Sequence, residues 1–251
     1  KNIKCFFLNN LLLFSVKNKS TFWIFGKHPV KEAILKNKKN VLKIITSNQL
    51  NENFLENLKI KIDPSFLKKK FKNDAHQGIA AELKVPLDLK INYNDIEKEK
   101  KLLILDGIND IRNIGSIFRS AYAFDFKNII INKKDYNMTD PYLYKSASGS
   151  IENLNIYNVV NVKYEIEELK KRNFKIYGLD SNNGESLVNV ISKIKKNDEM
   201  FAFVFGSEHK GIRRIIKDKC DQSIKINMSP NSFSLNVSNA ASVAMGIFFN
   251  L

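Results

Sequence analysis

The chain has 251 residues, of which 43% are hydrophobic, so it is long enough for one large domain or for two modest domains with separate cores. Lysine and arginine outnumber aspartate and glutamate by 41 to 26, and the formal charge of +15 is typical of proteins that bind phosphate backbones. Asn, Lys, Ile and Phe are abundant along the whole chain, as in proteins encoded by AT-rich genomes, so part of the lysine excess reflects genome composition on a solvated surface. Cys5 and Cys220 have no cysteine or histidine at ligand spacing, so we expect neither a disulfide framework nor a metal site.

Residues 1–20 have the pattern of a targeting leader. Lys1 and Lys4 precede an apolar segment, Cys5 to Val16, which has the length of a signal-peptide core and is followed by further lysines. An ordinary N-terminal strand or helix is the alternative. The leader favours an organelle, a mitochondrion or a plastid, over the cytoplasm. We expect no membrane association of the mature protein, because no apolar run approaches the roughly 20 residues that span a bilayer.

Residues 21–85 alternate short apolar runs with helical patterns, which predicts a small α/β domain. Strands are expected at Trp23–Phe25, Val41–Thr46 and Gly78–Leu83, and helices at Val30–Leu35 and Asn53–Leu58. Residues 86–101 are polar, charged and weakly periodic, which is typical of a linker between two folding units.

Residues 102–251 alternate near-continuous apolar strands with helical segments. Such strands need both faces covered, so the second unit is expected to be an α/β sandwich with a parallel sheet. The strands are expected at Leu102–Leu105, Asn128–Ile131, Ile156–Val159, Lys175–Leu179, Phe201–Phe205 and Ser223–Ile226.

The first polar cluster follows the strand that ends at Leu105. Gly115 opens the predicted helix and Arg119 lies on it, while Gly107 and Gly115 are too far apart to form the phosphate turn of a dinucleotide site. Taken singly, Asn113 is interpreted as a helix N-cap and Arg119 as a solvated helix position.

The second and third clusters also lie at the ends of predicted elements. Gly206 to Gly211 follow a buried strand, where glycine lets the backbone approach a ligand and Glu208 stands where open α/β sheets bind ligands. Ser234, Asn236 and Ser238 lead into a helix of small residues at 240–246. A loop acid beside a lysine and ordinary helix caps are the alternatives.

Together the clusters resemble the three motifs of the SpoU (TrmH) family of RNA 2′-O-ribose methyltransferases in the SPOUT superfamily. The matching patterns are N-x-G-x-x-x-R-S-A from Asn113, G-S-E-x-x-G from Gly206 and S-L-N-V-S from Ser234, with Lys145 to Glu152 similar to the family's SaGAxE segment. Gly26 to Ala33 and His76 to Ala80 are similar to the ribosomal-protein-like RNA-binding domain of two-domain members. These members include the RlmB-type large-subunit rRNA guanosine methyltransferases.

The resemblance implies a C-terminal α/β/α SPOUT domain with a deep trefoil knot, preceded by the small RNA-binding domain, and a homodimer that methylates RNA, with rRNA favoured. It implies S-adenosyl-L-methionine (AdoMet) as the cofactor. The implied catalytic residues are Arg119, Asn113, Glu208, Ser234 and Asn236. The implied cofactor-binding residues are Phe205, Gly206, Ser207, Ile226, Met228, Ser234, Leu235 and Asn236.

The implied role of Arg119 has to respect its chemistry. A guanidinium keeps its proton at physiological pH and is a poor base, so we expect Arg119 to grip the target phosphate and stabilise the developing alkoxide. Ser234 and Asn236 would position ribose and phosphate, and Glu208 would orient Arg119, including across a subunit interface.

The sequence departs from the family at several positions, and its motifs leave the substrate open. Proline is common in the family where this chain has Ile111 and Asn227, and glycine where it has Asp125, His209 and Pro230; Pro230 bears on the shape of the cofactor loop. The alternatives to large-subunit rRNA are tRNA, a different rRNA nucleotide, and a non-catalytic RNA-binding or ribosome-assembly protein with the same fold.

Overall fold

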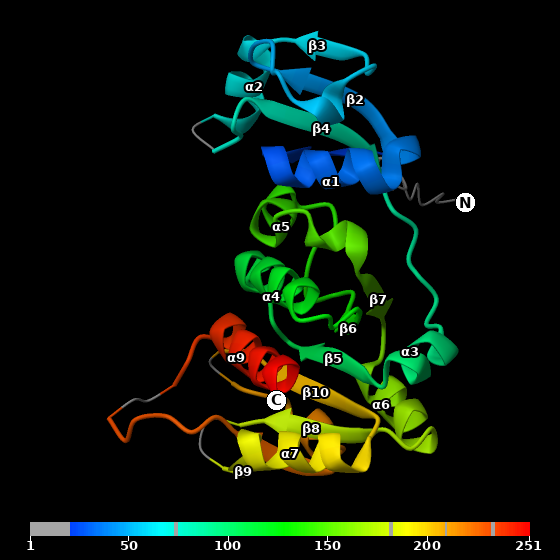
Figure 1. The fold of residues 1–251 in the computed structure, drawn as a ribbon, viewed down its shortest axis with the longest axis vertical. Coiled ribbons are helices and arrows are strands. Elements are labelled where there is room, and N and C mark those ends of the chain that lie inside the picture. Colours follow the sequence, from blue (N-terminus) through cyan, green and yellow to red (C-terminus); the bar gives the residue numbers. More distant parts are fainter. Residues whose placement is uncertain (1–20, 73–74, 181–182, 209, 232–233) are drawn as a thin grey trace, which may run out of the picture.

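The N-terminal unit of this computed structural model is a four-stranded sheet in the order β1-β4-β2-β3 (Figure 1). Antiparallel pairs join β4 to β1 and β2, and β3 runs parallel to β2. Helices α1 and α2 cover opposite faces of this sheet, because Val30 and Leu67 belong to separate clusters of buried side chains. The elements are β1 (Thr21–Phe25), α1 (Lys27–Asn37), η1 (Lys38–Asn40), β2 (Val41–Thr46), η2 (Asn53–Leu55), β3 (Ile60–Ile62), α2 (Pro64–Phe71) and β4 (Ile79–Lys84).

The structure describes residues 21–72, 75–180, 183–208, 210–231 and 234–251, so the leader predicted over residues 1–20 lies outside the described residues. Within those ranges, no helix has the length and apolar character needed to cross a membrane.

The C-terminal unit is built on a seven-stranded sheet in the order β7-β6-β5-β10-β8-β11-β9, in which every pairing is parallel. This confirms the predicted α/β class and the predicted strands. The trefoil knot implied by the resemblance stays a prediction. The strands are β5 (Lys101–Asp106), β6 (Asn128–Asn132), β7 (Asn155–Val159), β8 (Lys175–Leu179), β9 (Glu185–Ser186), β10 (Phe201–Gly206) and β11 (Gln222–Lys225).

Helices cover both faces of this sheet, because its central strands bury side chains on both sides. Leu103 and Leu105 pack in the same cluster as α4, α7 and α9, whereas Leu102 and Ile104 pack with α3, α6 and α8. Figure 1 shows α5 lying between α4 and α1. The helices are α3 (Tyr93–Glu99), α4 (Ile111–Ala123), α5 (Pro141–Ala147), η3 (Ser150–Asn153), α6 (Val162–Lys171), α7 (Leu187–Asn197), α8 (Arg214–Lys217) and α9 (Val237–Asn250).

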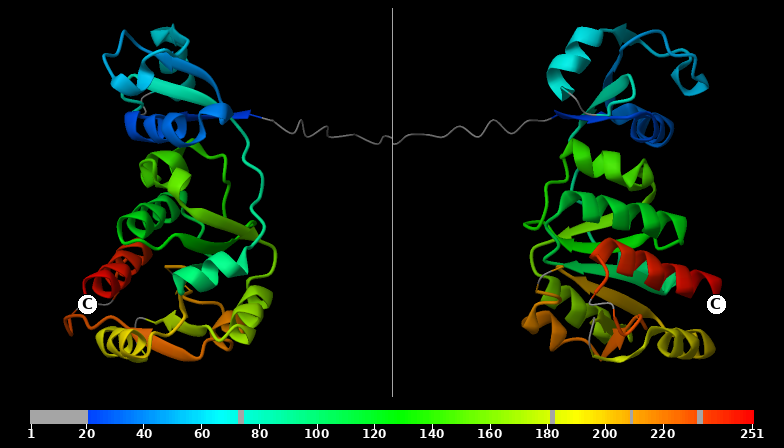
Figure 2. Two further views of the ribbon diagram at one scale, coloured as in Figure 1. Left: turned by 45° about the vertical axis from the view of Figure 1, so that its right-hand side comes forward. Right: turned by 90° about the vertical axis from the view of Figure 1, so that its left-hand side faces the viewer.

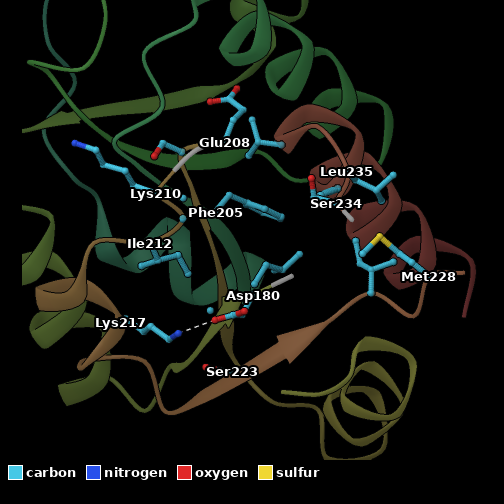
Figure 3. Close-up of a pocket in the computed structure, with 18 residues that line it drawn as sticks. Asp180, Phe205, Glu208, Lys210, Ile212, Lys217, Ser223, Met228, Ser234 and Leu235 are labelled. Carbon is cyan, nitrogen blue, oxygen red and sulfur yellow. Dashed lines mark hydrogen bonds and ion pairs between the residues drawn. The ribbon is translucent and has the colours of Figure 1, made fainter. Parts of the chain in front are cut away.

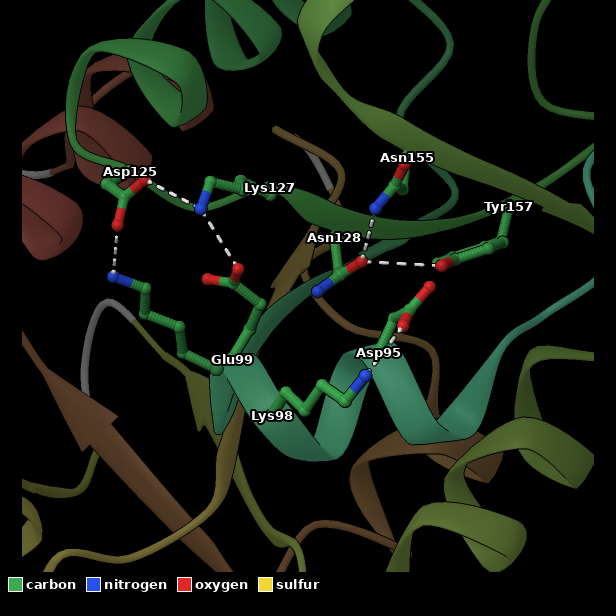
Figure 4. A network of polar contacts seen from close by, with 9 residues as sticks. Asp95, Lys98, Glu99, Asp125, Lys127, Asn128, Asn155 and Tyr157 are labelled. Atoms are coloured by element: carbon green, nitrogen blue, oxygen red, sulfur yellow. Dashed lines mark hydrogen bonds and ion pairs between the residues drawn. The ribbon is translucent and has the colours of Figure 1, made fainter.

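The segment expected to be a linker, residues 86–101, differs from that expectation because it contains α3. Ile96 of this helix is fully buried in the core beneath α6, and the Tyr93 hydroxyl donates to Glu165 at 2.6 Å. Lys127 binds Glu99 at the end of α3, beside the buried Asn128 that accepts hydrogen bonds from Asn155 and Tyr157 (Figure 4). Only the residues before α3 connect the two units without secondary structure of their own.

The two units share one continuous hydrophobic core across α1, β1 and α5. The rings of Phe22 and Tyr144 lie 5.2 Å apart across this junction. Gly149 lies so close to α1 that a Cβ there would come within 2.5 Å of Glu32 Cγ and 3.1 Å of the His28 carbonyl oxygen. The segment Lys145 to Glu152, singled out by its motif, therefore forms the surface against which the N-terminal unit packs, in the stack of helices seen in Figure 2.

Candidate functional site

A pocket of about 360 Å³ opens at the carboxyl ends of β8, β10 and β11, three neighbouring parallel strands (Figure 3). Open α/β sheets bind their ligands at this edge. The volume lies within the roughly 300–1,000 Å³ usual for small-molecule sites. The lining residues are Gly178, Leu179, Asp180, Phe205, Gly206, Ser207, Glu208, Lys210, Gly211, Ile212, Lys217, Ser223, Ile226, Met228, Ser234, Leu235, Val237 and Ala240.

One wall of the pocket is the tight loop that follows β10. Ser207 and Gly211 exchange backbone hydrogen bonds of 3.1 and 2.9 Å, which brings the two ends of the loop together. A Cβ at Gly206 would lie 2.1 Å from the Gly211 carbonyl carbon, so this approach requires glycine. Glu208 projects from the loop toward α4 (Figure 3).

A chain of amide and carboxylate groups connects the three motifs. The Asn113 side chain donates to Glu208, and the Asn236 side chain donates to the side-chain oxygen Oδ1 of Asn113 at 3.1 Å. The Asn236 oxygen in turn caps α9 by accepting from the Ser238 backbone N–H at 2.9 Å. Interpreting Asn113 as an N-cap was wrong, because α4 begins one turn earlier and Asp110 caps it, with the Arg112 N–H donating at 2.8 Å.

Helices α4 and α9 are also tied together directly. The hydroxyls of Ser120 and Ser242 lie 2.6 Å apart, and Ser242 donates to the Ser238 carbonyl oxygen at 2.8 Å. These contacts hold the start of α9, and hence Asn236, at a fixed place beside Asn113.

Arg119 lies on the exposed face of α4 and does not line the pocket. Within the described part of the chain it has no hydrogen bond or ion pair, and Glu208 contacts Asn113 in its place. The expected orientation of Arg119 by Glu208 is therefore not found within one chain. Arg119 is free to meet a group that arrives from solvent.

Most of the residues expected to bind the cofactor line the pocket. Phe205, Gly206, Ser207, Ile226, Met228, Ser234 and Leu235 do so, whereas Asn236 lies next to it in the amide chain. Sequence reasoning missed the residues that β8 contributes. They include Asp180, whose carboxylate accepts from Lys217 at 2.6 Å and raises the pKa of that lysine. The carboxyl end of each predicted parallel strand was a signal for residues near a ligand site. The sequence alone does not show that β8 is the strand beside β10.

Among the described residues, no group of three or more His, Cys, Asp or Glu side chains is placed to hold a metal ion.

The SpoU rRNA methylase family model matches residues 100–246, more than half of the chain. The chain belongs to the SpoU methylase family. A second model, the substrate-binding domain of RNA 2′-O ribose methyltransferases, matches residues 23–86. The two matched ranges fall on the two units of the fold.

Related proteins agree with this assignment over nearly the whole chain. A Staphylococcus aureus protein assigned to the TrmH family of tRNA/rRNA methyltransferases is 35% identical over 241 residues, 88% of this chain and 93% of its own length. The crystal structure of the SpoU methyltransferase AviRb from Streptomyces viridochromogenes with AdoMet is similar with a TM-score of 0.74 at 20% identity, covering 92% of this chain and 89% of that one. An AdoMet-bound rRNA methyltransferase from Sinorhizobium meliloti gives a TM-score of 0.69 at 14% identity, covering 91% and 87%.

Proposed function

We propose that this protein transfers a methyl group from AdoMet to a ribose 2′-hydroxyl of structured RNA, with a guanosine of large-subunit rRNA as the favoured target. One observation carries the proposal. The pocket at the carboxyl edge of the sheet lies directly beside the chain of contacts through Glu208, Asn113 and Asn236. A cofactor site and a set of groups able to position a hydroxyl are thus adjacent.

The pocket lining fits AdoMet. Phe205, Ile212 and Leu235 supply apolar surface, while Asp180 and Lys217 supply one charge of each sign, which suits a ligand with apolar and charged parts. Bound AdoMet supplies a methyl group already activated on a sulfonium. The protein then has to hold the ribose hydroxyl in line and stabilise the oxygen as its proton leaves.

The exposed guanidinium of Arg119 serves RNA in this proposal. With no competing partner among the described residues, Arg119 can bind the phosphate beside the target ribose through two parallel N–H bonds. Its fixed positive charge also stabilises an alkoxide. Ser234 and Asn236 can position the ribose, because Asn236 caps α9 and Ser234 comes two residues before it.

The N-terminal unit, residues 21–85, is proposed to bind the RNA, and the unit from β5 onward to carry the chemistry. The match of residues 23–86 to the substrate-binding model supports this division, and the net charge of +15 over the whole chain suits an RNA partner. A homodimer is proposed through α9, which exposes Val243 and Phe249 near the C-terminal Leu251.

The test is methylation of two substrates by the purified protein. In vitro transcribed rRNA and tRNA are incubated separately with AdoMet, and 2′-O-methyl positions are mapped by their resistance to alkaline cleavage. We expect one strong site in large-subunit rRNA. A methylated site found only in tRNA would replace rRNA by tRNA as the substrate. The name of the S. aureus relative includes both kinds of RNA. AdoMet binding without transfer to either RNA would favour the non-catalytic alternative.

A further inference from the structure

A buried carboxylate with no part in the proposed chemistry lies beside the candidate site. Asp106 ends β5, and its side chain is 0% exposed. Burying a carboxylate is strongly unfavourable unless its charge is paired and its oxygens accept hydrogen bonds. Within the described residues Arg213 meets both needs: its backbone N–H donates to Oδ2 at 2.9 Å, its Nε donates to Oδ1 at 2.8 Å, and a terminal guanidinium N–H also donates to Oδ1.

Both ends of the pocket loop lie against Asp106, one at its backbone and one at its side chain. Gly206, where the loop begins, is the register partner of Asp106 in the pairing of β10 with β5. Arg213, two residues after Gly211, binds the Asp106 side chain. The loop that carries Glu208 therefore starts and finishes at one residue of the neighbouring strand.

A second carboxylate binds the residue that follows Asp106. The Asp135 side chain accepts from the Gly107 backbone N–H at 2.9 Å. Burial raises the pKa of Asp135, and the hydrogen bond from Gly107 and then the positive charge of Arg213 only partly offset that rise. Asp106, Gly107 and Asp135 thus fix the start of the connection that leads into α4 and Asn113.

We propose that Asp106 and Arg213 form a positioning pair for methyl transfer. The pair holds the segment from Gly206 to Arg213 so that Glu208 meets Asn113 and Ile212 completes the wall of the pocket. Neither residue needs to touch RNA or cofactor. The inference rests on the proposed function for its effect on methylation, but its effect on AdoMet binding stands apart from the RNA.

The neighbouring arginine provides a matched control. Arg214 follows Arg213 directly, but its side chain is 96% exposed. Its only ion pair among the described residues is with Asp218, at 4.0 Å between Nε and Oδ2. Arg213→Met and Arg214→Met remove the same charge and the same donors from adjacent positions. Calorimetric titration with AdoMet, single-turnover methylation at saturating AdoMet and thermal melting are measured for both variants.

We expect Arg213→Met to weaken AdoMet binding by tenfold or more and to slow methylation further at saturating AdoMet. Arg214→Met should bind AdoMet within about twofold of the wild type. Arg213→Lys keeps a charge but loses the planar fork, so it should lie between Arg213→Met and the wild type and serves as the measurement if Arg213→Met does not fold.

A purely structural role gives a different pattern. In that case the Arg213 variants melt at a lower temperature, but once folded they bind AdoMet and methylate RNA as well as Arg214→Met does. That result overturns the proposal. Failure of the proposed function can be told apart from failure of the positioning pair. If the proposed function is wrong, the wild type transfers no methyl group to RNA. Calorimetry still reports in that case whether the Arg213 variants and Arg214→Met differ in AdoMet affinity.

Discussion

Among single residues, Arg119 is expected to contribute to the rate of methyl transfer and not to the binding of AdoMet. Arg119→Ala should leave AdoMet affinity within a few-fold of the wild type, because Arg119 does not line the pocket. The single-turnover methylation rate should fall by roughly two or more orders of magnitude, the usual scale for losing a charged transition-state contact. Arg119→Lys should recover only a small part of that rate, because it loses the planar fork.

Arg112 is the control for Arg119, since it lies two turns earlier on the same helix and its guanidinium is already paired with Asp110 at 3.2 Å. Arg112→Ala should change the rate by no more than a few-fold. Equal rates for Arg119→Ala and Arg112→Ala would show that Arg119 is an ordinary solvated helix residue with no part in methyl transfer.

A second residue-scale prediction concerns pH and Glu152. Burial raises the pKa of Glu152, the hydrogen bond from Asn37 lowers it, and the nearby Glu32 raises it again. Because the folded pKa lies above that of an unfolded glutamate, about 4.3, Glu152 contributes stability at low pH and loses it as pH rises through the folded pKa. Glu152→Gln stays neutral and should raise the melting temperature at pH 7–8 by about 2–4 °C, or about 1 kcal/mol.

The pH profile of melting checks this expectation. The gain from Glu152→Gln should shrink toward zero as the pH approaches 4, whereas the exposed Glu56→Gln should show no gain at any pH. A gain that is constant across this range would contradict the role assigned to the charge of Glu152.

The sequence motifs singled out residues that the structure places around one pocket, such as Phe205, Gly206 and Ser234, and their roles there stay predictions. Asp125, one of the departures from the family pattern expected from the resemblance, has a φ of 58°, in the region that favours glycine. Asp180 and Arg213 were not predicted. Their importance comes from strand neighbours that are distant in sequence, β11 for the one and β5 for the other.

At the scale of elements, the contact between η3 and α1 depends on Gly149. Gly149→Ala should destabilise the fold by more than backbone strain alone, because its Cβ meets Glu32 and the His28 carbonyl oxygen. Gly107→Ala is the control: its φ of 71° imposes similar strain, but a Cβ there meets nothing within 4 Å. Strain alone costs about 1–2 kcal/mol.

Melting and small-angle X-ray scattering separate the two effects. Both variants should melt earlier than the wild type, and only Gly149→Ala should increase the radius of gyration, because only it pushes the N-terminal unit away. Equal losses in the two variants and unchanged scattering would show that the contact is not tight.

The elements that sequence predicted are those with a strong apolar signature. Buried parallel strands such as β5 and β10 are near-continuous apolar runs and were placed within a residue or two. Helix α3 was missed because Ile96 is its only fully buried residue, which leaves no periodicity to detect. The helix expected at Asn53–Leu58 is only the short turn η2, and the lysine-rich α2 was missed although Asp63 and Pro64 form an N-terminal signal.

At the scale of the whole molecule, the shared core limits how the two units can be separated. A fragment that starts near Lys98 would cut α3 and remove the buried Ile96, so a fragment of the catalytic unit should begin before Asn92, which caps α3. The fragment 86–251 exposes Tyr144 and its neighbours, which β1 covers in the whole chain. It should melt earlier, bind AdoMet within a few-fold of the whole chain and methylate structured RNA poorly. Full activity on structured RNA would contradict the division of labour between the units.

Ribose methylation is tested by locating the transferred methyl group on the RNA. The whole chain is incubated with rRNA and AdoMet that carries a deuterated methyl group, and the RNA is digested to nucleosides for mass spectrometry. We expect the label in a 2′-O-methylnucleoside, with the mass of the ribose raised and the mass of the base unchanged. Label found on a base, or no label in rRNA or tRNA from a protein that binds AdoMet, would contradict it.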